Sequence, residues 1–327
     1  MHSKKSIARL LAVIVIYKRP LCESPSLRTL LDASALISET SVSLGILVRD
    51  NTPGGQDPGH IPEGVQYESA PGNPGLAQAY NRALEIAREE QYDWLITLDQ
   101  DTSLPPDFLV RVGALADKFE SCPMIGAIVP QVVGDGRILS PFHFVGGVLP
   151  RRFSSGFIGA SEQATYAVNS AAIVRVSTVS QIGGYNPIFP LDISDINLFH
   201  QLHRFGKRVF VAGDILIHHE FAILKKRQRM NIERYQDMLF DECAFWDLNM
   251  KPLARLERMM RLAGRACKDL FNSEEVAFRK ATFAELKRRL LTPRIQRVAE
   301  WTNWAKTRAS RSSKNTQQLA KGEIAAK

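Results

Sequence analysis

The sequence contains few cysteines, and none of them has a paired spacing. Cys22, Cys122, Cys243 and Cys267 lie far apart, and the 327 residues include no Cys-x-x-Cys pair. This spacing argues against a zinc ribbon and against the disulfide framework of a small secreted domain, and it is typical of a reducing compartment. Each cysteine is therefore interpreted as a small apolar side chain.

Long apolar runs are also lacking. No segment approaches the roughly 18 apolar residues that a membrane-spanning helix needs. The run Leu10–Tyr17 follows Lys4, Lys5 and Arg9 as a signal peptide core would, but it is short and has no small-residue cleavage site. Its β-branched residues favour a buried strand instead. We therefore expect a cytoplasmic protein.

Charge is distributed unevenly along the chain. The whole sequence has 42 Lys+Arg against 34 Asp+Glu, a net charge of +8. Residues 222–327 hold 24 basic and 12 acidic side chains, whereas residues 1–221 hold 18 and 22. A basic segment of this kind favours an anionic partner such as the inner face of the cytoplasmic membrane or a phosphate-bearing lipid. A solvated face of a helical bundle explains the same charge, and no aromatic-interleaved basic motif or helix-turn-helix pattern favours nucleic acid.

Short apolar runs alternate with helical spacing in the first half of the chain. The runs Leu11–Tyr17, Ser43–Val48 and Trp94–Leu98 predict strands, and Ser24–Leu36 and Pro74–Glu90 predict helices. This order predicts an α/β fold, a doubly wound and mostly parallel sheet with flanking helices. Ligands of such sheets bind beyond the carboxyl ends of the strands.

Later segments continue the pattern less regularly. We expect a helix over Phe108–Phe119 and another over Asp195–Phe205, with strands at Ile125–Val133, Ala167–Val176 and Lys207–Ala212. Pro130 predicts that its strand lies at an edge or ends there. Residues 134–165 are interpreted as loops and short strands around an acceptor site.

A change of pattern after residue 221 predicts two parts: a catalytic domain over residues 1–221 and a basic helical C-terminal extension over residues 222–327. Apolar residues recur there every three or four positions, at Leu253, Leu256, Met260, Ala263, Cys267 and Leu270. Such a stripe could lie in a membrane interface, pack on the catalytic domain or pair with another subunit. From about Ser310 the polar composition predicts disorder.

Asp99 and Asp101 are the first candidate functional residues. They follow the third predicted strand and precede a loop with two prolines. Two carboxylates at a strand end can converge on a hard cation such as Mg²⁺ or Mn²⁺, which often completes its shell with substrate phosphates. The pair therefore predicts a site for a nucleotide diphosphate.

Four blocks of sequence resemble the family 2 glycosyltransferases, which are nucleotide-sugar-dependent enzymes with a GT-A fold. The blocks are VIVIYKRP at Val13–Pro20, VRDNT at Val48–Thr52, NPGLAQAYN at Asn73–Asn81 and LDQDT at Leu98–Thr102. The last resembles a variant common among bacterial rhamnosyltransferases. The resemblance covers about residues 10–222.

The resemblance implies roles for individual residues. Asp50 matches the acid that recognises the base, Asp99 the acid near the ribose and metal, and Asp101 the direct metal ligand. The implied nucleotide-sugar-binding residues are Tyr17, Arg19, Asp50, Asn51, Gly75, Asn81 and Asp99. His219 matches a position that approaches the metal or the diphosphate. As alternatives from the residues alone, Asp50 is a turn former, and Gly75 and Asn81 belong to a tightly packed helix start.

A second acidic motif follows a Gly-Gly-aromatic turn. Gly183-Gly184-Tyr185 leads to Asp195 in the order that the family shows before its general base. We assign the base to Asp195, with Asp192 as a substitute, because an inverting transferase must deprotonate the acceptor hydroxyl. Ser194 and Asn197 stand where many relatives carry acids, and Asp195 could also be a helix N-cap.

Together these residues predict a metal-dependent inverting transfer of a sugar from a nucleotide donor to a hydroxyl of a surface-glycan or lipid-linked glycan acceptor. The resemblance favours dTDP-rhamnose as the donor. A nucleotidyltransferase is the alternative enzyme, but the turn after the first strand lacks the glycines of a phosphate loop. A non-catalytic sugar-nucleotide-binding subunit of a glycan assembly complex is the alternative outside enzymes.

Overall fold

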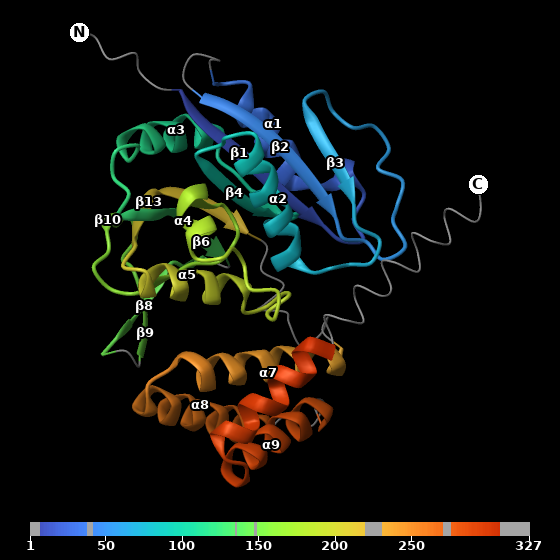
Figure 1. Ribbon diagram of the computed structural model, residues 1–327, viewed down its shortest axis with the longest axis vertical. Coiled ribbons are helices and arrows are strands. Elements are labelled where there is room, and N and C mark those ends of the chain that lie inside the picture. The colour runs from blue at the N-terminus through green and yellow to red at the C-terminus, as the bar shows by residue number, and fades with distance from the viewer. Residues whose placement is uncertain are drawn as a thin grey trace.

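The computed structural model describes residues 7–37, 42–134, 136–146, 149–219, 231–270 and 276–307. An α/β domain occupies one end of the molecule, and a bundle of helices from the C-terminal part of the chain packs at the other (Figure 1). This mixed α/β architecture, with a large central sheet and added C-terminal helices, confirms the predicted fold class.

The central sheet has the order β10-β13-β6-β12-β4-β1-β2-β3. Its strands are β1 (Ala8–Ile16), β2 (Val42–Asp50), β3 (Val65–Ser69), β4 (Trp94–Asp99), β6 (Ile125–Gly134), β10 (Ile158–Ala160), β12 (Ala172–Arg175) and β13 (Arg208–His219), with β5 (Thr102–Ser103) and β7 (Arg137–Ser140) paired at its rim. β1 pairs in parallel with both β2 and β4, while β12 runs antiparallel between β4 and β6. The carboxyl ends of β1, β2 and β4 therefore meet at one edge.

Helices cover both faces of this sheet. They are α1 (Pro25–Ser34), α2 (Leu76–Glu89), α3 (Phe108–Lys118), α4 (Val176–Gln181) and α5 (Ser194–Arg204), and a short 3₁₀ turn at Leu21–Glu23 precedes α1. Side chains of α1 and α3 pack in one apolar cluster, and those of α2, α4 and α5 pack in a second cluster on the opposite face. Alternate residues of β1 enter the two clusters, because successive side chains of a strand point to opposite faces.

Three expectations about the strands need correction. Pro130 lies inside β6, which is an interior strand between β12 and β13, so the prediction of an edge or strand end was wrong. The partner β13 has a register shift between Ala212 and Leu216 beside Pro130, and this irregularity accommodates a residue without a backbone N–H. The strand expected at Ala167–Val176 is confined to β12, and β13 extends to His219.

The irregular middle region contains a second, three-stranded sheet in the order β11-β8-β9. Its strands are β8 (Phe142–Val145), β9 (Leu149–Arg152) and β11 (Thr165–Tyr166). β3 was not expected, because Val65–Ser69 (VQYES) is short and lacks an apolar run.

The C-terminal bundle comprises α7 (Ile232–Asn249), α8 (Pro252–Leu270), α9 (Val276–Leu291) and a further helix over residues 294–307. Its core contains Phe245, Trp246, Leu262 and Trp301, together with Phe189 from a loop of the α/β domain. The Phe189 ring lies 5.1 Å from the Trp301 ring between centroids. The bundle therefore docks on the loop that precedes α5.

Much of the apolar stripe of α8 faces solvent. Leu253, Leu256 and Met260 are 68%, 49% and 59% exposed, whereas Leu262 and Ala266 turn into the bundle. The side chain of Leu270 and the tail from about Ser310 lie outside the described residues. In the part of the chain that the structure describes, no helix combines the length and apolarity needed to cross a membrane.

Candidate active site

Two serines at the start of α1 form hydrogen bonds with the turn that carries Asp99 and Asp101. The buried Ser26 hydroxyl contacts the carbonyl of Asp99 and that of Thr102 (3.0 Å), and it accepts a hydrogen bond from the Thr102 amide at 2.9 Å. Ser24 Oγ donates to the Gln100 carbonyl at 2.9 Å. Ser24 and Ser26 thus hold the backbone of this turn by hydrogen bonds.

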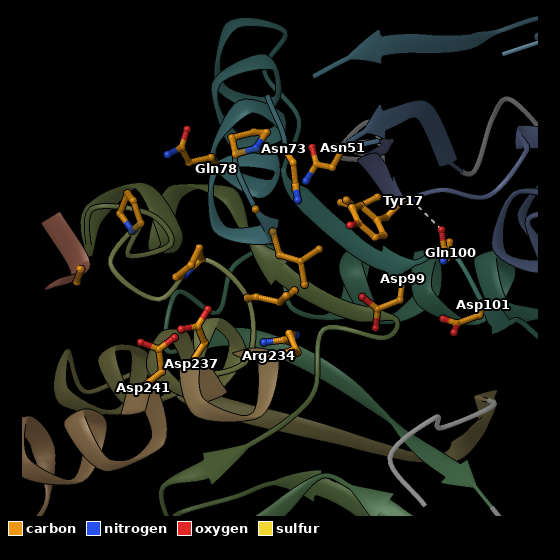
Figure 2. A pocket seen from close by; sticks show the side chains of 18 residues that line it. Tyr17, Asn51, Asn73, Gln78, Asp99, Gln100, Asp101, Arg234, Asp237 and Asp241 are labelled. Carbon is orange, nitrogen blue, oxygen red and sulfur yellow. Dashed lines mark hydrogen bonds between the residues drawn. The ribbon is translucent and has the colours of Figure 1, made fainter. Parts of the chain in front are cut away.

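These side chains face a cavity of about 530 Å³. One wall is the edge of the sheet, with Val15, Tyr17, Asn51, Asp99, Gln100 and Asp101. The segment around the start of α2 adds Asn73, Pro74, Gly75, Leu76 and Gln78. The other wall is formed by the loop with Pro187, Pro190 and Leu191 and by the bundle, with Arg234, Asp237, Asp241 and Ala305. Figure 2 shows the carboxylates of Asp99 and Asp101 on one side of this space and those of α7 on the other.

Polar contacts fix the sheet wall. Ser170 Oγ donates to Asp99 Oδ2 at 2.6 Å, which leaves the other oxygen of this carboxylate for a ligand or a neighbour. The Tyr17 amide donates to Gln100 Oε1 at 2.8 Å and ties the end of β1 to the turn after β4. Asn51 is only 3% exposed, and its amide oxygen has no hydrogen-bond partner among the described residues. A buried acceptor of this kind at a cavity suits a ligand N–H or O–H group.

Asp50 lies beneath this wall and does not line the cavity. It is fully buried; its Oδ1 accepts from the Thr52 amide at 2.8 Å, and its Oδ2 accepts from the Tyr67 hydroxyl at 2.6 Å. Burial, followed by the bond to Asp50, raises the pKa of Tyr67 well above its ordinary value. In this arrangement Asp50 supports the loop that presents Asn51, and Asn51 is the member of the pair that faces the cavity.

Gly75 and Asn81 position the second wall. Gly75 has a φ of +88°, and a Cβ atom at this position would lie 2.6 Å from the Pro190 carbonyl oxygen. Asn81 donates from Nδ2 to the Tyr185 carbonyl and accepts from the Tyr185 amide, both at 2.8 Å. Gly75 thus allows the loop before α5 to approach α2. Asn81 holds the Gly-Gly-Tyr turn by two hydrogen bonds and does not line the cavity.

Asp195 begins α5, and its carboxylate is the most perturbed acid near the site. Burial raises its pKa to about 7; the bond from the Ile196 amide (2.7 Å) opposes this shift, and the negative charges of Asp99 and Asp192 add to it. A carboxylate with a pKa near neutrality is suited to accept a proton from a hydroxyl. Asp195 is not among the residues that line the cavity, but Pro190 and Leu191 of the loop before it are, and the charge of Asp99 contributes to its raised pKa.

Asp192 is engaged differently. Its Oδ2 forms an ion pair with Arg234 Nη1 of α7. One oxygen of Asp192 is therefore already engaged with a cation of α7. Of the two acids proposed for the base, Asp195 has the more suitable surroundings.

The remaining predicted residues have varied positions. Tyr17 is 42% exposed at the cavity mouth. Arg19 is not among the lining residues, and its carbonyl accepts from Gln56 Nε2 at 2.9 Å. His219 ends β13, and its backbone pairs with Thr102 next to Asp101, but its side chain lies outside the described part of the structure.

Two carboxylates of the cavity, those of Asp99 and Asp101, fit an open site for a divalent cation. Among the described residues, no group of three or more His, Cys, Asp and Glu side chains could hold a metal ion. Mg²⁺ is commonly bound through one or two carboxylates, with water and substrate phosphates completing its shell. Asp99 and Asp101, both facing one cavity, fit that open kind of site rather than a closed protein cage.

Sequence patterns alone did not indicate Ser26, Ser170 or Arg234. Ser26 and Ser170 are common residues that act across 76 and 71 positions of the chain, so no local pattern marks them. The spacing of Arg234, Asp237 and Asp241 by three and four residues marks one polar helix face, but not the cavity that this face lines.

Comparison with known proteins agrees with this geometry. Residues 50–180 match the model of glycosyl transferase family 2, which spans less than half of the chain and supports a family 2 glycosyltransferase domain here. No curated protein matches the sequence. The bacterial rhamnosyltransferase branch is not singled out by these matches.

Solved structures resemble this chain at low sequence identity. S. aureus TarS 1-349 in complex with UDP-GlcNAc matches with a TM-score of 0.50 and 12% identity, over 98% of this chain and 92% of that one. S. aureus TarS matches with a TM-score of 0.48 and 12% identity, over 81% of this chain and 44% of that one. GalNAc-T7 with UDP, GalNAc and Mn²⁺ matches with a TM-score of 0.47 and 11% identity, over 72% of this chain and 48% of that one. This chain thus spans less than half of the TarS and GalNAc-T7 chains, and the TarS 1-349 match supports the GT-A fold.

Proposed function

We propose that this protein is an inverting glycosyltransferase that moves a sugar from a nucleotide donor to a hydroxyl group of a glycan acceptor. The observation that carries the proposal is a pair of carboxylates that line one cavity, with a third carboxylate of raised pKa coupled electrostatically to one of them. Asp99 and Asp101 line its sheet wall, and Asp195, with a pKa of about 7, lies within electrostatic reach of Asp99. The match of residues 50–180 to family 2 supports the same reaction class.

Asp195 acts as the base in this proposal. Its carboxylate takes the proton of the acceptor hydroxyl while the oxygen attacks the anomeric carbon of the donor. The bond from that carbon to the diphosphate oxygen breaks, and the nucleoside diphosphate leaves with the electron pair. General-base assistance of this kind contributes about 10²–10⁴ in rate.

The sheet wall binds the donor. The buried amide oxygen of Asn51 accepts a hydrogen bond from the base or ribose, and Tyr17 borders the same end of the cavity. Asp99 and Asp101 would hold Mg²⁺ or Mn²⁺, which neutralises charge on the departing diphosphate. Ser26 holds the backbone of this turn, and Ser170 holds the carboxylate of Asp99.

The donor sugar rests on resemblance. The segment Leu98–Thr102 resembles bacterial rhamnosyltransferases and favours dTDP-rhamnose, whereas TarS 1-349 was solved with UDP-GlcNAc. A panel of nucleotide sugars separates these donors: we expect metal-dependent hydrolysis or transfer with dTDP-rhamnose and loss of it in Asp101→Asn and Asp195→Asn. Tight donor binding without turnover under any condition would instead support a non-catalytic sugar-nucleotide-binding subunit.

We also propose that the bundle contacts an anionic membrane peripherally, which would bring a lipid-linked acceptor to the cavity. The exposed Leu253, Leu256 and Met260 on α8, in a net-basic extension, support this contact. Flotation with phosphatidylglycerol vesicles should recover the full chain, and replacing the three residues by Gln should reduce recovery.

The matched control replaces three equally exposed apolar residues of the α/β domain, Leu36, Val110 and Met124, by Gln. Equal flotation of both triple variants would rule out α8 as the contact. Recovery of the α8 variant in the light fraction at wild-type level would do the same.

A further inference from the structure

Helix α7 of the C-terminal bundle forms part of the cavity itself. Three of its side chains line the space: Arg234, Asp237 and Asp241. Their spacing of three and four residues puts them on one face of the helix, and Figure 2 shows all three on the wall across from Asp99. The C-terminal bundle therefore forms part of the cavity wall.

This wall is fixed in place. Asn231 caps α7 by accepting from the Arg234 amide at 2.8 Å, and Asp241, only 2% exposed, accepts from Trp301 Nε1 at 3.2 Å. Arg234 is ion-paired with Asp192, three residues before Asp195. The α7 face is thus tied both to the bundle core and to the loop that precedes α5, the helix that carries Asp195.

An inverting displacement requires the attacking and leaving oxygens on opposite sides of the anomeric carbon. The leaving diphosphate belongs at the sheet wall with Asp99 and Asp101, because ligands of such sheets bind at the carboxyl ends of the strands. The attacking hydroxyl must then arrive from the opposite wall, which is formed by the loop around Pro190 and by α7.

We propose, resting on the function above, that the face of α7 with Arg234, Asp237 and Asp241 is the acceptor subsite and that its occupant is a hydroxyl-rich saccharide. The guanidinium of Arg234 supplies N–H donors, and the two carboxylates supply acceptors. A sugar hydroxyl both donates and accepts, so neighbouring hydroxyls match such a face, whereas an apolar acceptor does not.

Saturation-transfer NMR on the full chain tests the subsite with p-nitrophenyl glycosides of common hexoses as probes, in the presence of Mg²⁺ and the best-bound of UDP, dTDP and GDP. We expect saccharide binding by the wild type. Asp237→Asn should weaken it about tenfold or more, since a hydrogen bond to a charged acceptor is stronger than one to a neutral amide. Nucleotide affinity should change less than twofold.

The control is Glu233→Gln, which removes the same charge from an exposed position on the same helix. It should bind saccharide as the wild type does. Nucleotide binding without saccharide binding in the wild type, or equal losses in both variants, would overturn the acceptor subsite and leave the proposed function standing. A wild type that binds none of the three nucleotides would instead refute the proposed function.

Discussion

The pKa of Asp195 predicts the pH dependence of transfer. Burial is the first cause of the rise of this pKa to about 7, and the negative charges of Asp99 and Asp192 add to it. A base works only when deprotonated. With a pKa of about 7, the active fraction is about one half at pH 7, about a tenth at pH 6 and about a hundredth at pH 5.

The assay is kcat/KM for transfer between pH 5 and 9, with donor binding measured over the same range as a control. We expect a tenfold fall per unit on the acid side, beginning near pH 7. Asp192→Asn should move this limb to lower pH, because it removes a negative charge that raises the pKa of Asp195. A profile flat down to pH 5, with donor still bound, would refute the assignment of Asp195 as the base.

Three further predictions concern the walls of the cavity. Ser26→Ala should lower the free energy of unfolding by about 1–3 kcal/mol in urea titrations, because it removes a buried hydroxyl that accepts from the Thr102 amide and contacts two backbone carbonyls. Ser34→Ala, which removes one hydroxyl bond at the end of the same helix, should cost less. Gly75→Ala should weaken nucleotide binding and lower the melting temperature, since its Cβ would lie 2.6 Å from the Pro190 carbonyl oxygen at a φ of +88°; an unchanged variant would show that this approach is not required. EDTA should lower nucleoside diphosphate affinity in calorimetry, and Asp101→Asn should abolish that dependence; affinity insensitive to both would contradict a metal at Asp99 and Asp101.

Strands buried on both faces were the most predictable part of the fold. β1 and β4 are apolar runs in the sequence, and their lengths and order suffice to predict a parallel core. β3 escaped prediction because its residues are mostly half-exposed and polar. The prediction of a strand edge or end at Pro130 was wrong because the register shift that accommodates this proline belongs to another strand. That strand is β13, which lies about 80 residues away in sequence.

The candidate site was predictable where its residues come directly after a strand. Asp99 and Asp101 line the cavity as expected, since the end of β4 places them at the ligand-binding edge. Asp50 and Asn81 lie at positions of the family motifs. In the structure, however, Asp50 accepts a hydrogen bond from Tyr67, and Asn81 donates one to the Tyr185 carbonyl. A motif residue that faces the cavity and one that supports the cavity wall look alike in the sequence. Only the tertiary structure distinguishes them.

The wall on α7 could not be read from sequence because it depends on how the bundle docks. Arg234 reaches Asp192 across 42 positions, and Phe189 enters the bundle core. Both contacts join parts of the chain whose patterns are independent. The predicted division at residue 221 separates two groups of elements that contribute to one cavity.

The most direct test of the account is product detection by mass spectrometry. The wild type is incubated with Mg²⁺ and a panel of nucleotide sugars and saccharide acceptors, and Asp195→Asn is treated in parallel. We predict a product heavier than the acceptor by one sugar residue with the wild type. The variant should bind nucleotide normally but give at least a hundredfold less product. Wild-type product levels from Asp195→Asn would contradict the account.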